Sequence, residues 1–184
     1  MEEKKIFLLD AYALIFRAYY AFIKNPRINS KGFNTSAVLG FTNSMLDIIN
    51  NQKPTHLAVV FDYPAQTFRS KEYSLYKANR QETPEDIKLS VPVIMEVIKA
   101  FNIPILMKEG FEADDVIGTL SVMAEKAGFT TYMMTPDKDF AQLVTDKTFM
   151  YKPARGGKGA EVWGVDEVKA AFEVEDPKQV IDIL

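Results

Sequence analysis

The sequence of 184 residues contains no cysteine. Disulfide bonds and thiolate metal sites are therefore excluded, and a reducing compartment is compatible with the composition. No apolar run approaches the ~18 residues that a membrane-spanning helix requires. The short run Ile6–Leu9 is interrupted at once by Asp10, so it does not read as a signal segment. The sequence also lacks a glycine-rich phosphate loop and a His, Ser and Cys set for covalent catalysis.

Positive charge is also scarce overall, because the formal net charge is −3. The whole-chain charge thus gives no indication of nucleic-acid binding. The cations are nevertheless concentrated in one place. Between Gln66 and Arg80 the chain has four cations and one anion, so this window carries a charge of +3. Charges of opposite sign are therefore kept apart along the chain.

Apolar segments of strand length alternate with helical patterns. Strands without polar alternation are typical of a parallel sheet that is covered on both faces. The sequence therefore predicts an α/β fold with a mostly parallel central sheet and helices on both faces. Hydrophobic residues make up 47% of the chain, which is enough for one core, so we expect a single domain over residues 1–184. The expected strands are residues 6–9, 57–61, 103–107, 131–134 and 148–151.

Helices are expected between the strands. The clearest start signal is Thr83-Pro84, where a capping residue precedes a proline at the first helical position and two acids follow. Pro92 should kink this helix or delay its start. Residues 152–160 contain three glycines and predict a loop or hairpin. The expected helices are residues 35–50, 83–101, 112–126 and a last one that opens at 176.

Seven carboxylates follow the predicted strands or begin a predicted helix. Because the carboxyl ends of parallel strands open on one edge of the sheet, we expect these side chains to converge in one crevice. Like charges raise one another's pKa and repel, and a divalent cation relieves this. More than about four carboxylates suggest two ions ~4 Å apart, as in the two-metal hydrolysis of phosphodiesters. The seven are Asp10, Asp62, Glu112, Asp114, Asp115, Asp137 and Asp139.

Each carboxylate also has an ordinary structural explanation. Acids in the first turn of a helix interact favourably with the helix dipole, which alone would account for Glu112, Asp114 and Asp115. A single aspartate after a strand, such as Asp10, is often a turn former. The metal hypothesis therefore rests on four groups of carboxylates at equivalent positions in the alternating pattern.

Residues 66–82 interleave aromatic and basic side chains. Cations bind phosphates and aromatic rings stack on unpaired bases, so the segment is a candidate DNA-binding surface. It begins four residues after Asp62 and should project over the metal end of the sheet. Arg17 would reach a phosphate near the site or pair with a surface acid. The alternative for the segment is a solvated surface helix. Its candidate residues are Phe68, Arg69, Tyr76, Lys77 and Arg80.

These motifs resemble the 5′→3′ exonuclease domain of bacterial DNA polymerase I, which belongs to the flap endonuclease family with its PIN-like fold. The resemblance covers essentially the whole chain. Its most specific parts are Glu-Ala-Asp-Asp at 112–115 and Asp-Lys-Asp at 137–139, in this order. Further matching segments are Leu8-Leu9-Asp10, Phe16-Arg17-Ala18-Tyr19, Val60-Phe61-Asp62, Thr67-Phe68-Arg69 and Tyr76-Lys77-Ala78-Asn79-Arg80.

The resemblance implies a hydrolase that cuts DNA at 5′ ends and 5′ flaps during primer removal and excision repair. Lys77 and Arg80 would be its catalytic cations, Tyr76 a base-stacking residue, and residues 66–82 part of a helical arch. The expected partner is flapped, nicked or primer-bearing DNA, bound by a monomer in a bacterial cytoplasm. The cofactors would be two Mg²⁺ ions, for which Mn²⁺ can substitute. The first ion would be bound by Asp10, Asp62, Glu112, Asp114 and Asp115, and the second by Asp137 and Asp139.

The chain departs from this family after residues 180–184. The family supplies two further metal-binding aspartates and a helix–hairpin–helix beyond this point. The second metal should then bind weakly, and we expect a fragment with reduced or no activity. Two alternatives stay open, a PIN-type RNA nuclease and a module that binds DNA ends without cutting. The segment 76–80 argues against the first, because short PIN domains usually lack an arch.

Overall fold

The computed structural model describes residues 3–65, 67–73, 82–154 and 159–183. Within these ranges the strands form one six-stranded sheet with the order β3-β2-β1-β4-β5-β6. Every pair of neighbours is parallel except β5 and β6. The predicted α/β fold with a mostly parallel sheet is therefore confirmed. The strands are β1 (Lys5–Asp10), β2 (His56–Val60), β3 (Ile105–Leu106), β4 (Thr130–Met134), β5 (Thr148–Lys152) and β6 (Glu161–Trp163).

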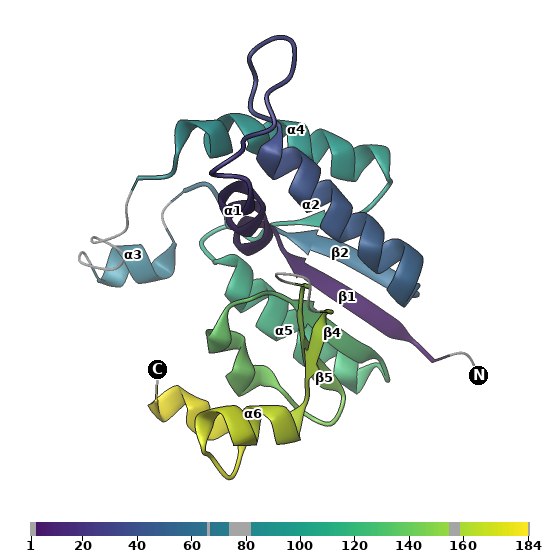
Figure 1. Cartoon of the computed structure of the whole chain (residues 1–184). Helices are drawn as coiled ribbons and strands as arrows, with labels where there is room; N and C mark the ends of the chain where they lie inside the picture. Colours follow the sequence, from purple (N-terminus) through teal and green to yellow (C-terminus); the bar gives the residue numbers. More distant parts are fainter. Residues whose placement is uncertain (1–2, 66, 74–81, 155–158, 184) are drawn as a thin grey trace.

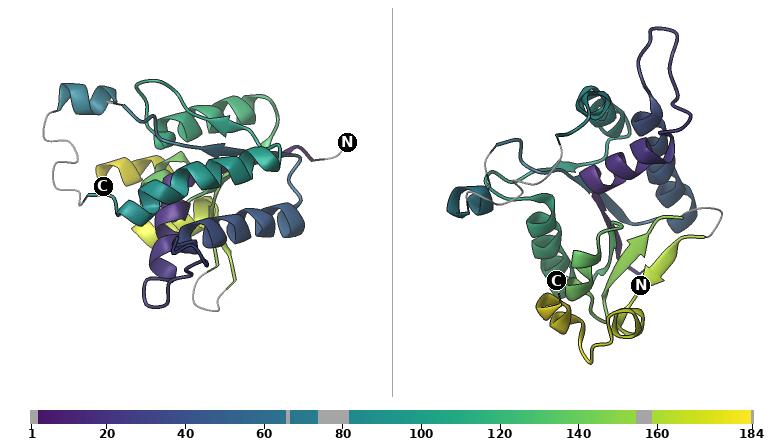
Figure 2. Two further views of the ribbon diagram at one scale, coloured as in Figure 1. Left: turned by 90° about the horizontal axis from the view of Figure 1, so that it is seen from above. Right: turned by 60° about the vertical axis from the view of Figure 1, so that its left-hand side comes forward.

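Helices cover both faces of the sheet (Figures 1 and 2). No helix in the described ranges is long and apolar enough to cross a membrane. The α-helices are α1 (Ala11–Ala21), α2 (Ser36–Asp47), α3 (Phe68–Glu72), α4 (Glu85–Ala100), α5 (Ala113–Lys126) and α6 (Val165–Phe172). A π-helical turn, η1 (Ile48–Gln52), continues α2, and two 3₁₀-helices are η2 (Lys138–Leu143) and η3 (Pro177–Asp182).

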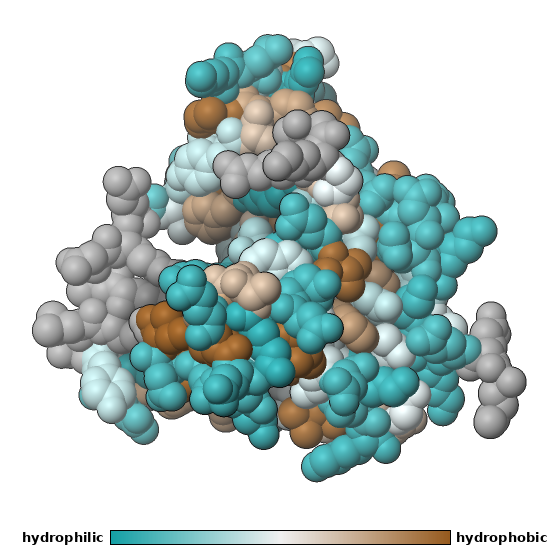
Figure 3. Space-filling model, turned by 60° about the horizontal axis from the view of Figure 1, so that its bottom comes forward, coloured by the Kyte–Doolittle hydropathy of each residue, from teal (hydrophilic) through white to brown (hydrophobic). Residues whose placement is uncertain are grey.

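The core is divided between the two faces by the alternation of side chains along each strand. Phe7 and Leu9 of β1 belong to a buried cluster that also contains residues of α1, α2 and α4. Leu8 belongs to a second cluster with Ile117 of α5 and residues of η2, α6 and η3. On the surface drawn in Figure 3, apolar side chains form small patches among hydrophilic ones. The strands therefore sit between two helical layers, which fixes their register.

The order of the strands creates a switch point beside β1. The chain passes from β1 to β2 and β3 on one side, and then returns to place β4 on the other side of β1. In open α/β sheets, ligands bind in the crevice beyond the carboxyl ends of the strands at such a point. β1 ends at Asp10 and β4 at Met134, so both lead into this crevice.

Helix α1, which leaves the crevice, packs closely on α2. A Cβ atom added to Gly40 of α2 would lie 2.6 Å from the Cβ atom of Ala18 in α1. This distance is shorter than any ordinary carbon–carbon contact. Glycine at position 40 therefore allows α1 and α2 to cross closely, and this contact fixes the position of α1 next to the crevice.

Some elements differ from the sequence-based expectation. Helix α4 begins at Glu85 and contains Pro92, so the delayed start is wrong, while the alternative expectation of a kink stays a prediction. β3 is reduced to Ile105–Leu106, directly after Pro104, which has no backbone N–H to donate. Helices α1 and α6 and strand β6 were not predicted. α6 has only eight residues, so its apolar pattern is too short to be recognised in the sequence.

Candidate metal centre

Asp10 joins β1 to α1. As the N-cap of α1 it accepts a hydrogen bond from the backbone N of Ala13 at 3.2 Å through Oδ1. Its Oδ2 accepts a hydrogen bond from the hydroxyl of Thr135 at 3.1 Å. Aspartate is among the preferred N-cap residues, which explains why the helix begins directly after the strand. The side chain is thereby fixed at the switch point.

The environment of Asp10 disfavours its negative charge. Burial raises the pKa of Asp10 from 3.8 to about 6, and the nearby charges of Asp62 and Asp137 also raise it. The hydrogen bonds from Ala13 and Thr135 act in the opposite direction. A carboxylate with these surroundings is stabilised by a cation placed beside it.

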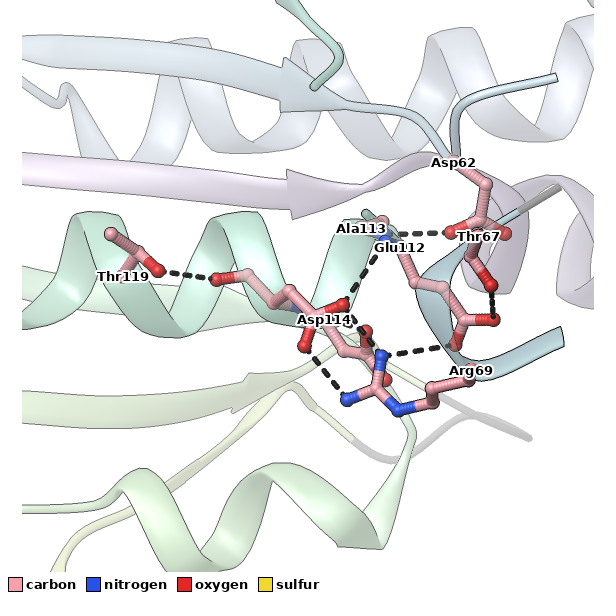
Figure 4. A network of polar contacts seen from close by, with 8 residues as sticks. Asp62, Thr67, Arg69, Glu112, Ala113, Asp114 and Thr119 are labelled. Atoms are coloured by element: carbon pink, nitrogen blue, oxygen red, sulfur yellow. Dashed lines mark hydrogen bonds and ion pairs between the residues drawn. The ribbon is translucent and has the colours of Figure 1, made fainter. Parts of the chain in front are cut away.

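Asp62 joins the end of β2 to the beginning of α5. Its Oδ1 accepts a hydrogen bond of 2.7 Å from the backbone N of Ala113, the first residue of that helix (Figure 4). The first N–H groups of a helix have no partner within the helix, and a carboxylate there also interacts favourably with the helix dipole. Asp62 therefore holds the N-terminus of α5 against the sheet.

The first turn of α5 carries three further carboxylates. Glu112 is the N-cap and is 5% exposed, and its backbone N donates to Asp115 Oδ2 at 3.1 Å in a capping box. Asp114 Oδ1 accepts from the backbone N of Asp115 at 2.8 Å. Partial burial raises the pKa of Asp114, and the charges of Asp115 and Glu112 raise it further. This turn is thus crowded with negative charge.

The loop after β4 supplies the last two carboxylates. The backbone N of Asp137 donates to the hydroxyl of Thr135 at 3.2 Å, and Asp137 Oδ1 accepts from the backbone N of Asp139 at 3.0 Å. Partial burial raises the pKa of Asp139, and the charge of Asp137 adds to this effect. The hydroxyl of Thr135 therefore connects Asp10 to this loop.

The structure brings these carboxylates to one region. Five of them line a single cavity of about 270 Å³, together with the rings of Tyr12 and Phe16. Asp115 and Asp139 line a neighbouring cavity of about 410 Å³, which shares two lining residues, Asp114 and Phe140, with the first. The five in the first cavity, here called the acidic cleft, are Asp10, Asp62, Glu112, Asp114 and Asp137.

The acidic cleft has the chemistry of a site for hard divalent cations. Its donors are carboxylate oxygens, which Mg²⁺ and Ca²⁺ prefer. Across the described part of the chain, no three Asp, Glu or His side chains are drawn together as a ready ligand set. Like charges repel, and Asp62 is held by the backbone of α5 instead. The chemical type of these side chains therefore suits a divalent cation. The side chains would have to move to surround it.

Two of the expected DNA-binding cations have partners within the protein. Arg69 of α3 makes a two-point ion pair with Asp115, at 2.6 and 2.7 Å. Arg17 of α1 donates to the carbonyl oxygens of Pro153, at 3.3 Å, and Ala154. Both guanidinium groups therefore hold segments of the chain in place.

Some of the aromatic and basic candidates lie within the described residues and others lie outside them. Phe68 is 38% exposed, and its ring lies 5.6 Å from that of Phe111. Tyr76, Lys77 and Arg80 lie outside the described residues. Their expected roles in stacking and catalysis stay predictions.

Thr135 is a site residue that the sequence did not reveal. It is fully buried, yet its hydroxyl donates to Asp10 and accepts from the backbone N of Asp137. A hydroxyl residue between a buried strand and Asp137 was the only signal in the sequence. It was insufficient, because the partner Asp10 lies 125 residues away in the chain.

Comparison with known proteins shows the family to which the chain belongs. Residues 5–173 match the family described as 5′-3′ exonuclease, N-terminal resolvase-like domain. DNA polymerase I of Bacillus subtilis (strain 168) is 38% identical over 183 residues, which cover 99% of this chain and 20% of that protein. A 5′-3′ exonuclease of Aquifex aeolicus (strain VF5) is 37% identical over 181 residues, which cover 98% of this chain and 60% of that protein. The chain therefore spans less than two thirds of either relative.

Solved structures show the same fold. A 5′-exonuclease of bacteriophage T5 with bound zinc ions has a TM-score of 0.77 at 19% identity, covering 96% of this chain and 64% of that one. A flap endonuclease of the same phage, in a pseudo-enzyme-product complex with DNA and metal ions, has a TM-score of 0.67 at 20% identity and the same coverage. At these identities the likeness concerns the fold alone.

Proposed function

Because the chain belongs to the family of 5′-3′ exonuclease N-terminal domains that includes a domain of DNA polymerase I, we propose that it hydrolyses DNA phosphodiesters at 5′ ends and 5′ flaps with the help of divalent cations. The observation that carries the proposal is the acidic cleft, to which four separate segments contribute carboxylates at the switch point of the sheet. Carboxylates this close together repel one another and do not stabilise the fold. Their arrangement is suited to holding the cations of two-metal phosphodiester hydrolysis.

We assign the carboxylates to two cations, Mg²⁺ or its substitute Mn²⁺. When bound, such ions neutralise charge on the reacting phosphate and make a water molecule a nucleophile near neutral pH. The chain's own groups orient the ligands, since Thr135 and Ala113 hold Asp10 and Asp62 by hydrogen bonds. The proposed ligands are Asp10, Asp62, Glu112 and Asp114 for one cation and Asp137 and Asp139 for the other. Asp115, which was predicted as a fifth ligand of the first cation, is paired with Arg69 and is not included.

The substrate strand would enter beside the aromatic wall of the acidic cleft. Tyr12 and Phe16 line the cleft and are partly buried against the core, and aromatic rings beside a nucleic-acid site stack on unpaired bases. Lys77 and Arg80 are proposed to stabilise the charge that develops on the phosphate, and Tyr76 to stack on a base.

The biological setting is part of the same proposal. We propose that the protein works on primers and damaged strands in a bacterial cytoplasm, as a monomer, and the likeness to DNA polymerase I of Bacillus subtilis supports this setting. The chain matches 20% of the length of the Bacillus subtilis relative. We therefore also propose that this domain is part of a longer protein that contains a polymerase region.

Cleavage assays with labelled nucleic acids test the function. We expect weak cleavage at the 5′ end of a 5′-flapped duplex with Mg²⁺ or Mn²⁺, and none with EDTA or with Asp10→Asn. Preferential cleavage of single-stranded RNA would instead favour a PIN-type RNA nuclease. Metal-independent binding of flapped DNA without any product would identify a DNA-end-binding module and overturn the nuclease proposal.

A further inference from the structure

Arg69 and Asp115 form the closest ion pair between α3 and α5 in the described ranges. Arg69 NH1 donates to Asp115 Oδ2 at 2.6 Å, and NH2 donates to Oδ1 at 2.7 Å. Asp115 Oδ2 also accepts the backbone N–H of Glu112 at 3.1 Å. The hydrogen bond to Asp115 is the main reason why the pKa of Arg69 is raised. Both oxygens of Asp115 are therefore engaged by groups of the protein itself.

Other contacts join the same two segments. The backbone N of Phe68 donates to the carbonyl of Gly110 at 2.9 Å, and the Phe68 ring packs 5.6 Å from that of Phe111. Arg69 NH1 also lies 3.8 Å from Glu112 Oε2, and the hydroxyl of Thr67 donates to Glu112 Oε1 at 3.5 Å. These contacts of α3 converge on residues 110–115, at the metal-facing end of α5.

The ion pair has the geometry of a structural anchor. A helix of five residues such as α3 is too short to be stable by itself and depends on its packing. Two-point arginine–carboxylate pairs are stronger and more specific in direction than single contacts. The side chains are 29% and 20% exposed, so solvent screens this pair less than a fully exposed one.

The geometry points to Asp115 as a positioning residue rather than a metal ligand: with Arg69 and Glu112 it forms a latch that fixes α3 to the acidic cleft. The latch contacts the cleft through Glu112, which lines it and lies beside Arg69. The positive charge of Arg69 offsets part of the negative charge of Asp115 and Glu112, next to the proposed ligands. Its part in catalysis rests on the proposed nuclease function, whereas its structural role does not.

Metal affinity separates a latch residue from a ligand. Isothermal titration of the protein with Mn²⁺ should show at least a tenfold loss of affinity for Asp114→Asn, the neighbouring proposed ligand. For Asp115→Asn and Arg69→Gln we expect an affinity within about threefold of the wild type, or tighter for Arg69→Gln because a positive charge is removed. A loss for Asp115→Asn equal to that for Asp114→Asn would overturn the proposal.

A double-mutant cycle in EDTA tests the latch without metal or substrate. Urea unfolding of Arg69→Gln, Asp115→Asn and the double variant should give a coupling of about tenfold in the unfolding constant, or about 1.4 kcal/mol. Lys88→Gln, which breaks an exposed pair with Glu82, is the matched control and should leave stability unchanged. Additive losses from the two latch variants would contradict the proposal.

Turnover distinguishes positioning from stability alone. On a 5′-flapped duplex, at a temperature where all variants are folded, Asp115→Asn and Arg69→Gln should lower kcat by about ten- to a hundredfold while Mn²⁺ affinity is kept. Arg69→Lys should recover part of kcat, because it retains one charged donor. Unchanged kcat in both latch variants would overturn the positioning role. If the wild type neither binds Mn²⁺ nor cuts DNA, the nuclease proposal fails. The double-mutant cycle in EDTA would still show whether the latch exists, because it needs neither metal nor substrate.

Discussion

The carboxylate of Asp62 accepts a hydrogen bond of 2.7 Å from the backbone N of Ala113. This contact joins the end of β2 to the first turn of α5, across 51 positions of sequence. The carboxylate that lines the acidic cleft is thus also the partner that the helix N-terminus requires. The placement of Glu112 and Asp114 consequently depends on a residue of their own cleft.

This double role predicts a difference between two substitutions of Asp62. Asparagine keeps an oxygen that accepts the Ala113 N–H, so Asp62→Asn should change stability in EDTA by less than about 0.5 kcal/mol. Alanine removes the acceptor and should cost about 1 kcal/mol. Urea unfolding measures both, and Mn²⁺ titration should show weakened binding for both. Equal destabilisation by the two substitutions would contradict the role of Asp62 at the helix terminus.

The raised pKa of Asp10 predicts how the stability of the metal-free protein depends on pH. Its folded pKa of about 6 lies above the ordinary 3.8, so the folded state disfavours the charged form. The favourable contribution of the protonated group is complete below about pH 4 and is lost as the pH rises through about 6. The loss amounts to about 3 kcal/mol for a shift of about two units.

The variant Asp10→Asn isolates this effect, because asparagine keeps the N-cap oxygen for Ala13 and carries no charge. In EDTA its stability relative to the wild type should increase between pH 4 and pH 7, as measured by urea unfolding. A difference that is constant over this range would show that Asp10 ionises normally in the folded protein.

The buried hydroxyl of Thr135 predicts a selective effect of its removal. Thr135→Val keeps the shape but leaves Asp10 Oδ2 without its donor, at an expected cost of about 1–2 kcal/mol. Loss of a hydrogen bond that lowers the pKa of Asp10 should raise this pKa further and weaken Mn²⁺ binding near pH 6. Thr135→Ser, which retains the hydroxyl, should stay close to the wild type in unfolding and titration. Identical behaviour of valine and serine would refute the assigned role.

The crossing of α1 and α2 predicts that Gly40→Ala is destabilising by about 1–3 kcal/mol, despite the higher helix propensity of alanine. The new Cβ atom would meet the Cβ and backbone of Ala18, which cannot move without shifting α1. The control is Gly118→Ala in α5, where the nearest atom is the flexible side-chain end of Leu143 at 3.3 Å. Thermal unfolding should show neutral or increased stability for the control. A stable Gly40→Ala variant would argue against the close crossing.

Sequence patterns predicted the fold class and the convergence of carboxylates because both follow from local rules. Apolar strands such as β1 and β4 are recognisable in isolation, and their carboxyl ends meet by topology. The partners of individual side chains did not follow, because contacts such as Arg69 with Asp115 depend on tertiary packing over 46 positions. For the same reason the pairing of Arg69 with Asp115 was not foreseen, and the predicted contact of Arg69 with DNA stays a prediction. β6 was not predicted because its three residues are too few to show the alternation by which a strand is recognised.

The central claim is that the acidic cleft binds divalent cations, and crystals of the protein soaked in Mn²⁺ test it most directly. The account predicts an anomalous-scattering peak within coordination distance of carboxylate oxygens from Asp10, Asp62 and Asp114, with Asp115 still paired to Arg69. Peaks only at other places on the protein surface, with the cleft carboxylates unmoved at saturating Mn²⁺, would contradict the account.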